Sequence, residues 1–243
     1  MQCWAVTDPG CVRSQNQDTF QIVELGRDAI LCVVCDGMGG AKSGNVASSL
    51  ATEVFVEEIR RTWTDDMQQA EIDQMLQGAV KLANFTVYDQ GKQFEEFSGM
   101  GTTLVAALVK EQEVTIVNVG DSRAYGINAN GIHKITVDHS LVELMVQRGE
   151  LTPEAARTYP GKNYITRAIG TEAIVECDLF HADMEQGNCL LMCSDGLTNV
   201  IDEQEILFEV IHGQKKENCC QQLLDIAKNR GAPDNVTCVL VLI

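Results

Sequence analysis

The order of the apolar segments constrains the fold of this chain more than any other feature. Stretches typical of β-strands come in blocks, and stretches with helical spacing come in pairs between the blocks. A parallel doubly wound sheet would need strands and helices to alternate, so this order argues against one. Two mainly antiparallel sheets that face each other, with a helix pair on each outer face, would bury every apolar face. The sequence therefore predicts an α+β protein built in this way.

The predicted elements fill the chain without an internal repeat or a proline-rich linker, so we expect a single domain over residues 1–243. The predicted strands cover residues 2–7, 19–25, 29–35, 102–109, 114–119, 123–127, 174–180, 189–193 and 236–243. The first long helix has apolar residues on one face, at Val46, Leu50, Val54 and Ile59. The other predicted helices cover residues 67–90, 140–157, 203–211 and 217–228.

The charge of the chain narrows the range of partners. Its net charge is −17, from 35 acidic and 18 basic residues. Such a body repels nucleic acid and anionic membranes, so we expect neither as a partner. The chain has no apolar run of about 18 residues, as a transmembrane helix would need, and its first residues lack the pattern of a secretory signal. We therefore expect a cytoplasmic protein that acts as a monomer.

The ten cysteines do not have the spacing of a zinc site or a disulfide framework. Cys32 and Cys35 form the one CxxC pair, but they lie in a predicted strand, where side chains three apart point to opposite faces. Cys189 and Cys193 would share a strand face but lie about 13 Å apart at about 3.3 Å per residue. We interpret the cysteines as reduced residues of the core.

Aspartates follow or precede the apolar strands at four places. Asp36, Asp121 and Asp195 each come directly after a strand-like run, and Asp234 lies just before the last predicted strand. Any one of them is more simply explained as a turn or helix-cap residue. Their recurrence favours a shared role, because hard cations such as Mg²⁺ and Mn²⁺ bind clustered carboxylate oxygens. We expect the strand ends to converge on one rim of the sandwich.

The glycine-rich stretch 37–44 resembles a P-loop only superficially. Ala41 stands where that motif needs the glycine before Lys-Ser, and Asp36 stands where it needs its first glycine. A nucleotide-binding loop is therefore excluded. Glycines here would instead let the backbone pass close to a metal, with the Gly37 carbonyl as a candidate ligand.

Arg13 lies in a polar run between two predicted strands, Arg13-Ser14-Gln15-Asn16-Gln17-Asp18. An arginine beside an acidic metal site can hold a phosphate through two parallel hydrogen bonds. Taken alone, the residue is better explained as an ordinary surface arginine.

Seven segments together resemble the metal-dependent protein phosphatases of the PP2C (PPM) type, in their compact bacterial form. They occur in the order of that family and span nearly the whole chain: Arg13-x-x-Asn16-Gln17-Asp18, Asp36-Gly37-Met38-Gly39-Gly40, Gly101-Thr102-Thr103, Val119-Gly120-Asp121-Ser122-Arg123, Asp138-His139-Ser140, Ser194-Asp195-Gly196-Leu197-Thr198 and Asp234-Asn235-Val236-Thr237. The resemblance implies a four-layer α-β-β-α sandwich, which agrees with the order of the predicted elements.

The resemblance also implies a centre of two Mn²⁺ or Mg²⁺ ions. Asp36 would bridge the two ions, and the Gly37 carbonyl would bind one of them. Asp195 and Asp234 would bind the other ion. Asp18 would hold one site through water.

Further residues have roles that follow from the same resemblance. Asp121 resembles the ligand of a third, weaker metal site, and Asn16 and Asn235 would support the ligands. Arg13 would bind the substrate phosphate. The segment at about 140–170 corresponds to the mobile flap beside the family's active site.

The implied activity is the hydrolysis of phosphoserine and phosphothreonine in proteins, the targets of a serine/threonine kinase, by a metal-activated water. Two positions depart from the pattern of some members. Gln17 replaces a glutamate, and Met38 replaces a histidine that has been regarded as the general acid. His139 is the one histidine inside a matching segment, and a structural role suits it better than acid catalysis, because no partner is visible.

Two alternatives remain open at this stage. The chain could bind phosphoproteins without cleaving them, although its set of candidate metal ligands is intact. It could also be a phosphatase that acts on small molecules.

Overall fold

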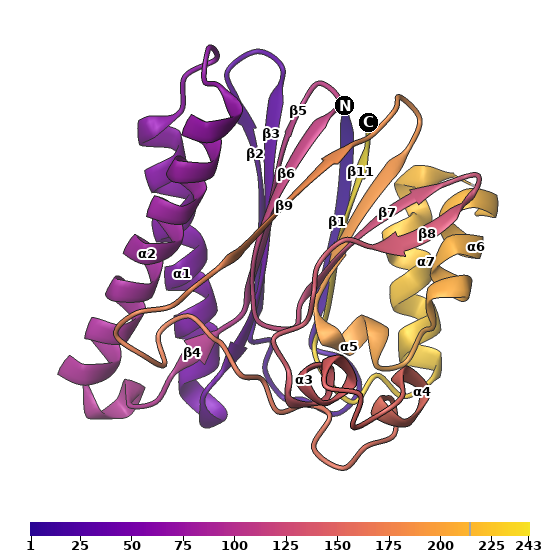
Figure 1. Ribbon diagram of the computed structural model, residues 1–243. Helices are drawn as coiled ribbons and strands as arrows, with labels where there is room; N and C mark the ends of the chain where they lie inside the picture. Colours follow the sequence, from indigo (N-terminus) through magenta and orange to yellow (C-terminus); the bar gives the residue numbers. More distant parts are fainter. Residues whose placement is uncertain (214) are drawn as a thin grey trace.

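The computed structural model describes residues 1–213 and 215–243, apart from the side chains of residues 40–42, and it contains two facing antiparallel sheets (Figure 1). One sheet has the strand order β1-β11-β10-β7-β8, with the bounds Gln2–Asp8, Val236–Leu242, Cys189–Cys193, Arg123–Asn128 and Gly131–Lys134. The other has the order β2-β3-β5-β6-β9, with the bounds Asp18–Leu25, Ala29–Met38, Leu104–Lys110, Glu113–Val119 and Asp178–Asp183. A short strand, β4 (Gly101–Thr102), pairs with the end of β3.

Two helices cover the outer face of each sheet, which gives the four layers seen in Figure 1. The second sheet carries α1 (Gly40–Thr62) and α2 (Gln69–Gln93). The first carries α6 (Glu203–His212) and α7 (Lys216–Asn229). The remaining helices are short: η1 (Glu95–Phe97), α3 (Leu141–Gln147), α4 (Pro153–Ala156) and α5 (Asp195–Thr198). The predicted α-β-β-α sandwich is confirmed.

Three apolar clusters hold the layers together. Phe55 of α1 packs in a cluster with Leu31 of β3, and Leu223 of α7 packs in a cluster with Leu191 of β10. The neighbouring Leu190 points the other way, into the cluster between the two sheets. This alternation follows from the two-residue period of a strand, and it explains why the central strands are apolar on both faces.

All ten cysteines are free thiols. Cys32 and Cys35 belong to clusters on opposite faces of β3, as their spacing predicts. Seven cysteines are buried, but Cys11 is exposed, so the expectation of a core position is wrong for that residue.

The structure differs from the predicted elements in several places. The strand expected at 174–180 begins only at Asp178, and the strand expected at 29–35 continues to Met38. The helix expected at 140–157 is divided into α3 and α4, because Gly149 has a φ of +71° and Thr152 caps a new helix that starts with Pro153. The short elements β8 and α5 were not predicted.

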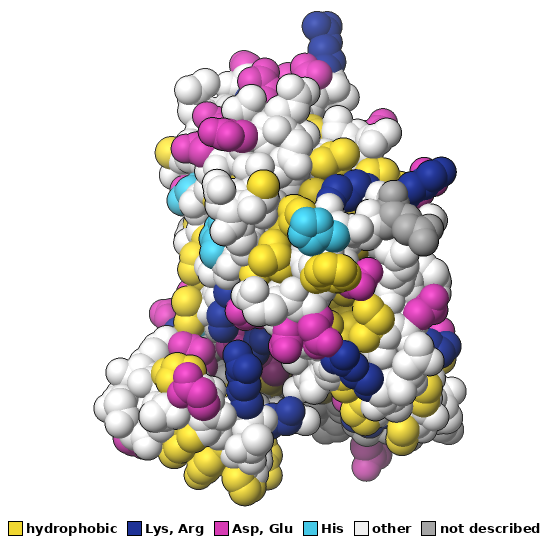
Figure 2. Space-filling view, turned by 90° about the vertical axis from the view of Figure 1, so that its right-hand side faces the viewer, with side chains coloured by type: hydrophobic (Ala, Val, Ile, Leu, Met, Phe, Trp, Pro, Cys, Tyr) yellow, Lys and Arg dark blue, Asp and Glu magenta, His cyan; other side chains and the backbone are white. Residues whose placement is uncertain are grey.

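The short helices α3, α4 and α5 lie at the end of the molecule opposite the two chain termini (Figure 1). Figure 1 shows α3, α4 and α5 at the lower end, while the N- and C-termini meet at the upper end of the sheets. Acidic and basic side chains are interspersed on the face seen in Figure 2, so the excess of acidic residues does not form one continuous surface there. Among the described residues, none of the helices combines the length and apolarity needed to cross a bilayer.

Candidate metal centre

A cleft of about 530 Å³ opens at the lower end of the sandwich, where ends of strands from both sheets meet. Its walls include four aspartates and one arginine that the sequence singled out, namely Asp36, Asp121, Asp195, Asp234 and Arg13. Asn163 and Ile165, in the segment expected to be the flap, form another part of the wall. The structure therefore brings the strand-end aspartates together on one rim.

Asp36 lies within β3, where two neighbouring threonines fix its backbone. Its N–H donates to the hydroxyl of Thr103 at 2.9 Å. Its carbonyl accepts from the N–H of Thr103 at 2.8 Å and from the hydroxyl of Thr102 at 2.9 Å. These three hydrogen bonds tie the backbone of Asp36 to the end of β4, so the carboxylate has a defined position at the cleft.

Gly37 has a packing reason to be glycine. A Cβ built at this position would lie 2.0 Å from the carbonyl oxygen of Gly44 and 2.7 Å from that of Gln17. No side chain fits there, because α1 begins directly beside β3. The backbone of Gly37 faces the cleft, as the proposed carbonyl ligand requires.

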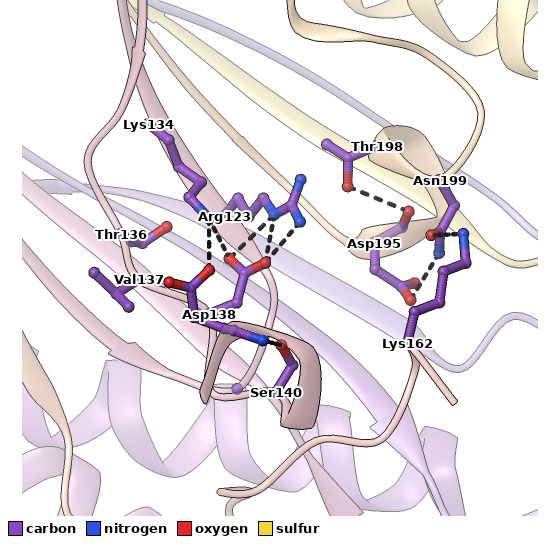
Figure 3. Close-up of polar contacts among 12 residues, drawn as sticks. Arg123, Lys134, Thr136, Val137, Asp138, Ser140, Lys162, Asp195, Thr198 and Asn199 are labelled. Carbon is purple, nitrogen blue, oxygen red and sulfur yellow. Dashed lines mark hydrogen bonds and ion pairs between the residues drawn. The ribbon is translucent and has the colours of Figure 1, made fainter. Parts of the chain in front are cut away.

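Asp195 begins α5, and the residue that caps the end of this helix, Asn199, holds its carboxylate. The amide nitrogen of Asn199 donates to Asp195 Oδ2 at 2.9 Å, and Lys162 Nζ donates to Asn199 Oδ1 at 2.9 Å. Figure 3 shows Asn199 between Asp195 and the flap residue Lys162. Sequence reasoning missed Asn199, although its spacing of four residues from Asp195 was a usable signal.

Asp234 lies just before β11 and forms an ion pair with Arg13. Arg13 Nη2 lies 2.8 Å from Asp234 Oδ2, and the hydrogen bond raises the pKa of Arg13 above its usual value. The side chain of Arg13 is 55 % exposed, so its guanidinium can also reach a ligand in the cleft.

Asp18 lies beneath the cleft and is not part of its wall. It is the register partner of Asp36 across β2 and β3, and its Oδ2 accepts from the hydroxyl of Ser194 at 2.8 Å. Its Oδ1 is buried and has no hydrogen-bond partner. Burial raises the pKa of Asp18 to about 7, and the charges of Asp195 and Asp234 add to the rise.

Asp121 follows β6 and comes directly after Gly120, a position that only glycine can occupy. Gly120 has a φ of +107°, and a Cβ there would lie 2.6 Å from Thr103 Cγ2. Burial, followed by the charge of Asp195, raises the pKa of Asp121 to about 7. Burial and mutual repulsion likewise raise the pKa of Asp36 and of Asp195.

Asn16 and Asn235 fasten the loop that carries Arg13. Asn235 Oδ1 accepts from the N–H of Gln17 at 2.9 Å, and its amide nitrogen donates to the carbonyls of Pro9 and Gln15 at 3.0 and 2.9 Å. Asn16 donates to Thr7 Oγ1 at 2.7 Å. Both asparagines therefore support the loop by hydrogen bonds to their neighbours.

The donor set suits a hard divalent cation. Four carboxylates meet at one cleft, one buried carboxylate oxygen is left without a partner, and a cation would relieve the repulsion that raises the pKa values. Within residues 1–213 and 215–243, no group of three or more His, Cys, Asp or Glu side chains is arranged to hold an ion by itself. The four carboxylates around the cleft still suit Mg²⁺ and similar ions, because such an ion usually keeps several waters and takes only one or two carboxylates.

No histidine of the described chain lines the cleft, and Met38 occupies part of its wall. His139 is 5 % exposed and has both ring nitrogens directed at protein groups. Burial lowers the pKa of His139, although the hydrogen bond that its ring donates to Asp178 opposes the shift. His139 is thus placed away from any leaving group in the cleft.

Known protein phosphatases are similar to this chain over most of its length. The family model "Protein phosphatase 2C" matches residues 12–226. The serine/threonine phosphatase stp of Listeria monocytogenes is 36% identical over 97% of this chain and 93% of its own length. Protein phosphatase PhpP of Streptococcus pneumoniae is 34% identical over 99% of this chain and 97% of its own length.

A solved structure gives the same result at the level of the fold. Serine/threonine phosphatase Stp1 from Staphylococcus aureus superimposes with a TM-score of 0.94 and 38% identity, over 100% of this chain and 94% of that one. The sequence match and the fold point to the same family. The chain belongs to the protein phosphatase 2C family of metal-dependent hydrolases.

Proposed function

We propose that this protein hydrolyses phosphoserine and phosphothreonine in other proteins at a centre of two Mn²⁺ or Mg²⁺ ions, with a third, weaker site. The observation that carries the proposal is the cleft itself, in which one arginine faces four carboxylates from both sheets. A carboxylate cluster suits divalent cations, and an arginine beside it suits a phosphate dianion.

The residues of this chain divide the metal binding among them. Asp36 would bridge the two principal ions, with the Gly37 carbonyl on one and Asp195 and Asp234 on the other. Asp121 would hold the third ion. Asp18, which lies below the cleft wall, would act through water, and its unpartnered Oδ1 is available for such a hydrogen bond.

The chemistry then follows from the charges at the cleft. When bound, the divalent ions supply a water nucleophile that is active at neutral pH and neutralise charge on the phosphoryl group. Arg13 would orient the phosphate and stabilise the charge on its equatorial oxygens, because a guanidinium presents five N–H donors in a planar fork. No covalent intermediate on the protein is needed. A water molecule would donate the proton to the leaving group, since Met38 has none to give.

The substrates would be phosphorylated proteins, the products of a serine/threonine kinase. We also propose that the chain acts as a single cytoplasmic domain, with a flap at about 140–170 beside the cleft. Asn163 and Ile165 support the flap assignment, because they form part of the cleft wall.

Hydrolysis assays test the proposal directly. The protein should hydrolyse p-nitrophenyl phosphate and a phosphothreonine peptide in Mn²⁺, and EDTA should abolish both activities. Faster turnover of the peptide than of sugar phosphates would support a protein substrate. Mn²⁺ binding without hydrolysis of any phosphate ester would instead indicate a non-catalytic phosphoprotein-binding role.

A further inference from the structure

His139 connects the turn that presents Asp121 to the end of the flap. The side chain is almost completely buried, with 5 % of its surface exposed. Nδ1 of His139 accepts a hydrogen bond from the backbone N–H of Gly120 at 3.0 Å. The backbone N–H of His139 donates to the Gly120 carbonyl at 2.9 Å. The two residues therefore hold each other through two hydrogen bonds, one to the imidazole and one between their backbones.

The contacts of the ring determine its tautomer. A backbone N–H can only donate, so Nδ1 of His139 must carry no proton when it accepts from Gly120. In the neutral ring the proton then lies on Nε2, which is 3.2 Å from Asp178 Oδ2. Arg167 Nη1, also 3.2 Å from Nε2, is directed instead to Asp178 Oδ1 at 2.8 Å. Asp178 thus fixes the imidazole in the one form that can hold the turn.

The turn at Gly120 depends on such fixation. The Gly120 backbone has a positive φ, which lets the chain leave β6 and place Asp121 at the cleft. The amide nitrogen of Asn118 donates to the carbonyls of Gly120 and Val137, both at 3.2 Å. The backbone N–H of Gly120 donates to Nδ1 of His139.

The same histidine is joined to the flap. The carbonyl of His139 accepts from the N–H of Thr166 at 2.7 Å, and Ser140 pairs with Ile165 in an antiparallel bridge. Ile165 lines the cleft. Two residues further along, Arg167 donates a hydrogen bond to the carboxylate of Asp178. The wall that the flap contributes is therefore fixed to the residue that fixes Asp121.

We propose that His139 is a positioning residue that holds the Asp121 turn and the base of the flap in one register through its neutral Nε2–H imidazole. This inference rests on the proposed function, in which Asp121 binds the weaker metal ion. It assigns His139 no proton transfer to substrate, because the ring contacts protein groups and does not line the cleft.

Three substitutions of His139, made in the full chain, test the roles of its two ring nitrogens separately. In His139→Asn the amide oxygen can stand where Nδ1 accepts from Gly120. In His139→Gln the longer amide reaches toward the Nε2 position instead, and His139→Ala replaces neither nitrogen. The control is His181→Asn, which removes a half-exposed imidazole whose Nε2 lies 2.9 Å from Asp73 Oδ1, outside the cleft.

Two measurements compare these variants with the wild type without an assay of phosphate hydrolysis. Hydrogen exchange of the Gly120 amide, followed by NMR, should accelerate about tenfold or more in the Gln and Ala variants, since the lost hydrogen bond protects that proton. Calorimetric titration should show Mn²⁺ binding at the weaker site reduced about tenfold in the same two variants, as for other residues that orient a metal ligand. His139→Asn should recover most of both properties, and the control should match the wild type.

The outcomes decide between the roles. An Nδ1–H tautomer in the nitrogen NMR spectrum, or an Asn variant no better than Ala in both measurements, would overturn the inference. Equal loss of thermal stability in all three variants, with unchanged Gly120 exchange relative to global unfolding, would also overturn it, in favour of a merely structural residue. A wild-type protein that binds Mn²⁺ but hydrolyses nothing would contradict the proposed function alone, because amide exchange and calorimetry still test His139.

Discussion

Arg13 Nη2 lies 2.8 Å from Asp234 Oδ2, so the arginine assigned to the substrate phosphate is paired with an aspartate assigned to a metal ion. The two residues are 221 positions apart in the chain. The pair keeps the guanidinium directed into the cleft, while its other N–H groups remain able to bind phosphate.

Arg13→Ala should therefore weaken substrate binding more than turnover. A hydrogen bond to a charged group is worth about 1.5–3 kcal/mol, which corresponds to a rise in KM of roughly 10- to 100-fold for p-nitrophenyl phosphate. Steady-state kinetics and calorimetric Mn²⁺ titration check this expectation. Arg61→Ala, which removes an arginine paired with Glu58 on the surface, is the matched control. Loss of Mn²⁺ binding in Arg13→Ala would contradict the assigned role.

Asp36→Asn should abolish catalysis while the fold remains. The amide keeps the shape of the side chain but removes the charge that would bridge two ions, so we expect kcat to fall about 1,000-fold or more. Asp183→Asn, on the exposed end of β9, makes the same change of charge outside the cleft and should leave kcat unchanged. A wild-type rate for Asp36→Asn in Mn²⁺ would refute the metal centre as described.

Asp18 should make the metal-free protein less stable as the pH rises. Its pKa is about 7 in the folded protein and near 3.8 in the unfolded chain, so folding favours the protonated form. The free energy that this group contributes is therefore fully present below pH 3.8 and is lost as the pH rises through about 7.

Asp18→Asn removes that dependence. In EDTA the variant should exceed the wild type in free energy of unfolding by roughly 4 kcal/mol at pH 8, and by roughly 2 kcal/mol at pH 5. Urea denaturation at both pH values measures the difference. An advantage that is equal at pH 5 and pH 8 would show that the buried carboxylate does not titrate as the structure indicates.

Asn199→Ala should weaken metal binding through Asp195. The substitution removes the donor to Asp195 Oδ2 and also the acceptor for Lys162 Nζ, so both the carboxylate and the flap lose a contact (Figure 3). We expect Mn²⁺ affinity to fall roughly 10-fold, as for other residues that orient a ligand. Lys162→Ala keeps the bond to Asp195 and should change affinity less. Equal effects of the two variants on Mn²⁺ affinity would mean that the flap contact, and not the carboxylate contact, controls the site.

Metal should also stabilise the fold. Because an ion bound only by the folded state adds about 2.7 kcal/mol at 100 times its Kd, Mn²⁺ should raise Tm in the wild type. Asp36→Asn should show a much smaller rise. Thermal denaturation with Mn²⁺ or EDTA measures the effect, and an equal rise in both proteins would place the stabilising ion elsewhere.

The sequence by itself determined the layers of the fold and the convergence of Asp36, Asp121, Asp195 and Asp234. Alternating apolar residues specify which face of each strand is buried, and this local information survives in any tertiary context. An aspartate next to such a strand then has its place set by the strand end. These features could be read without knowing which strands pair.

Pairing between distant segments decided the rest. The strand expected at 174–180 starts at Asp178 because its partner β6 ends: Asn118 is opposite Asp178, and the chain turns away at Gly120. The residues before it are held outside the sheet by Asn84 of α2, whose amide nitrogen donates to the Glu172 carbonyl at 3.0 Å. No local pattern carries this information.

The inner contacts of the site are likewise tertiary. Asp18 lies below the cleft wall, opposite Asp36 on the neighbouring strand, and the carbonyl of His139 accepts a hydrogen bond from Thr166. The sequence showed which residue types could bind metal and phosphate. Only the packing of segments that are apart in the chain decided which of them line the cleft and which support those that do. The hydrogen bond between Ser194 and Asp18, for example, forms only after both sheets have met.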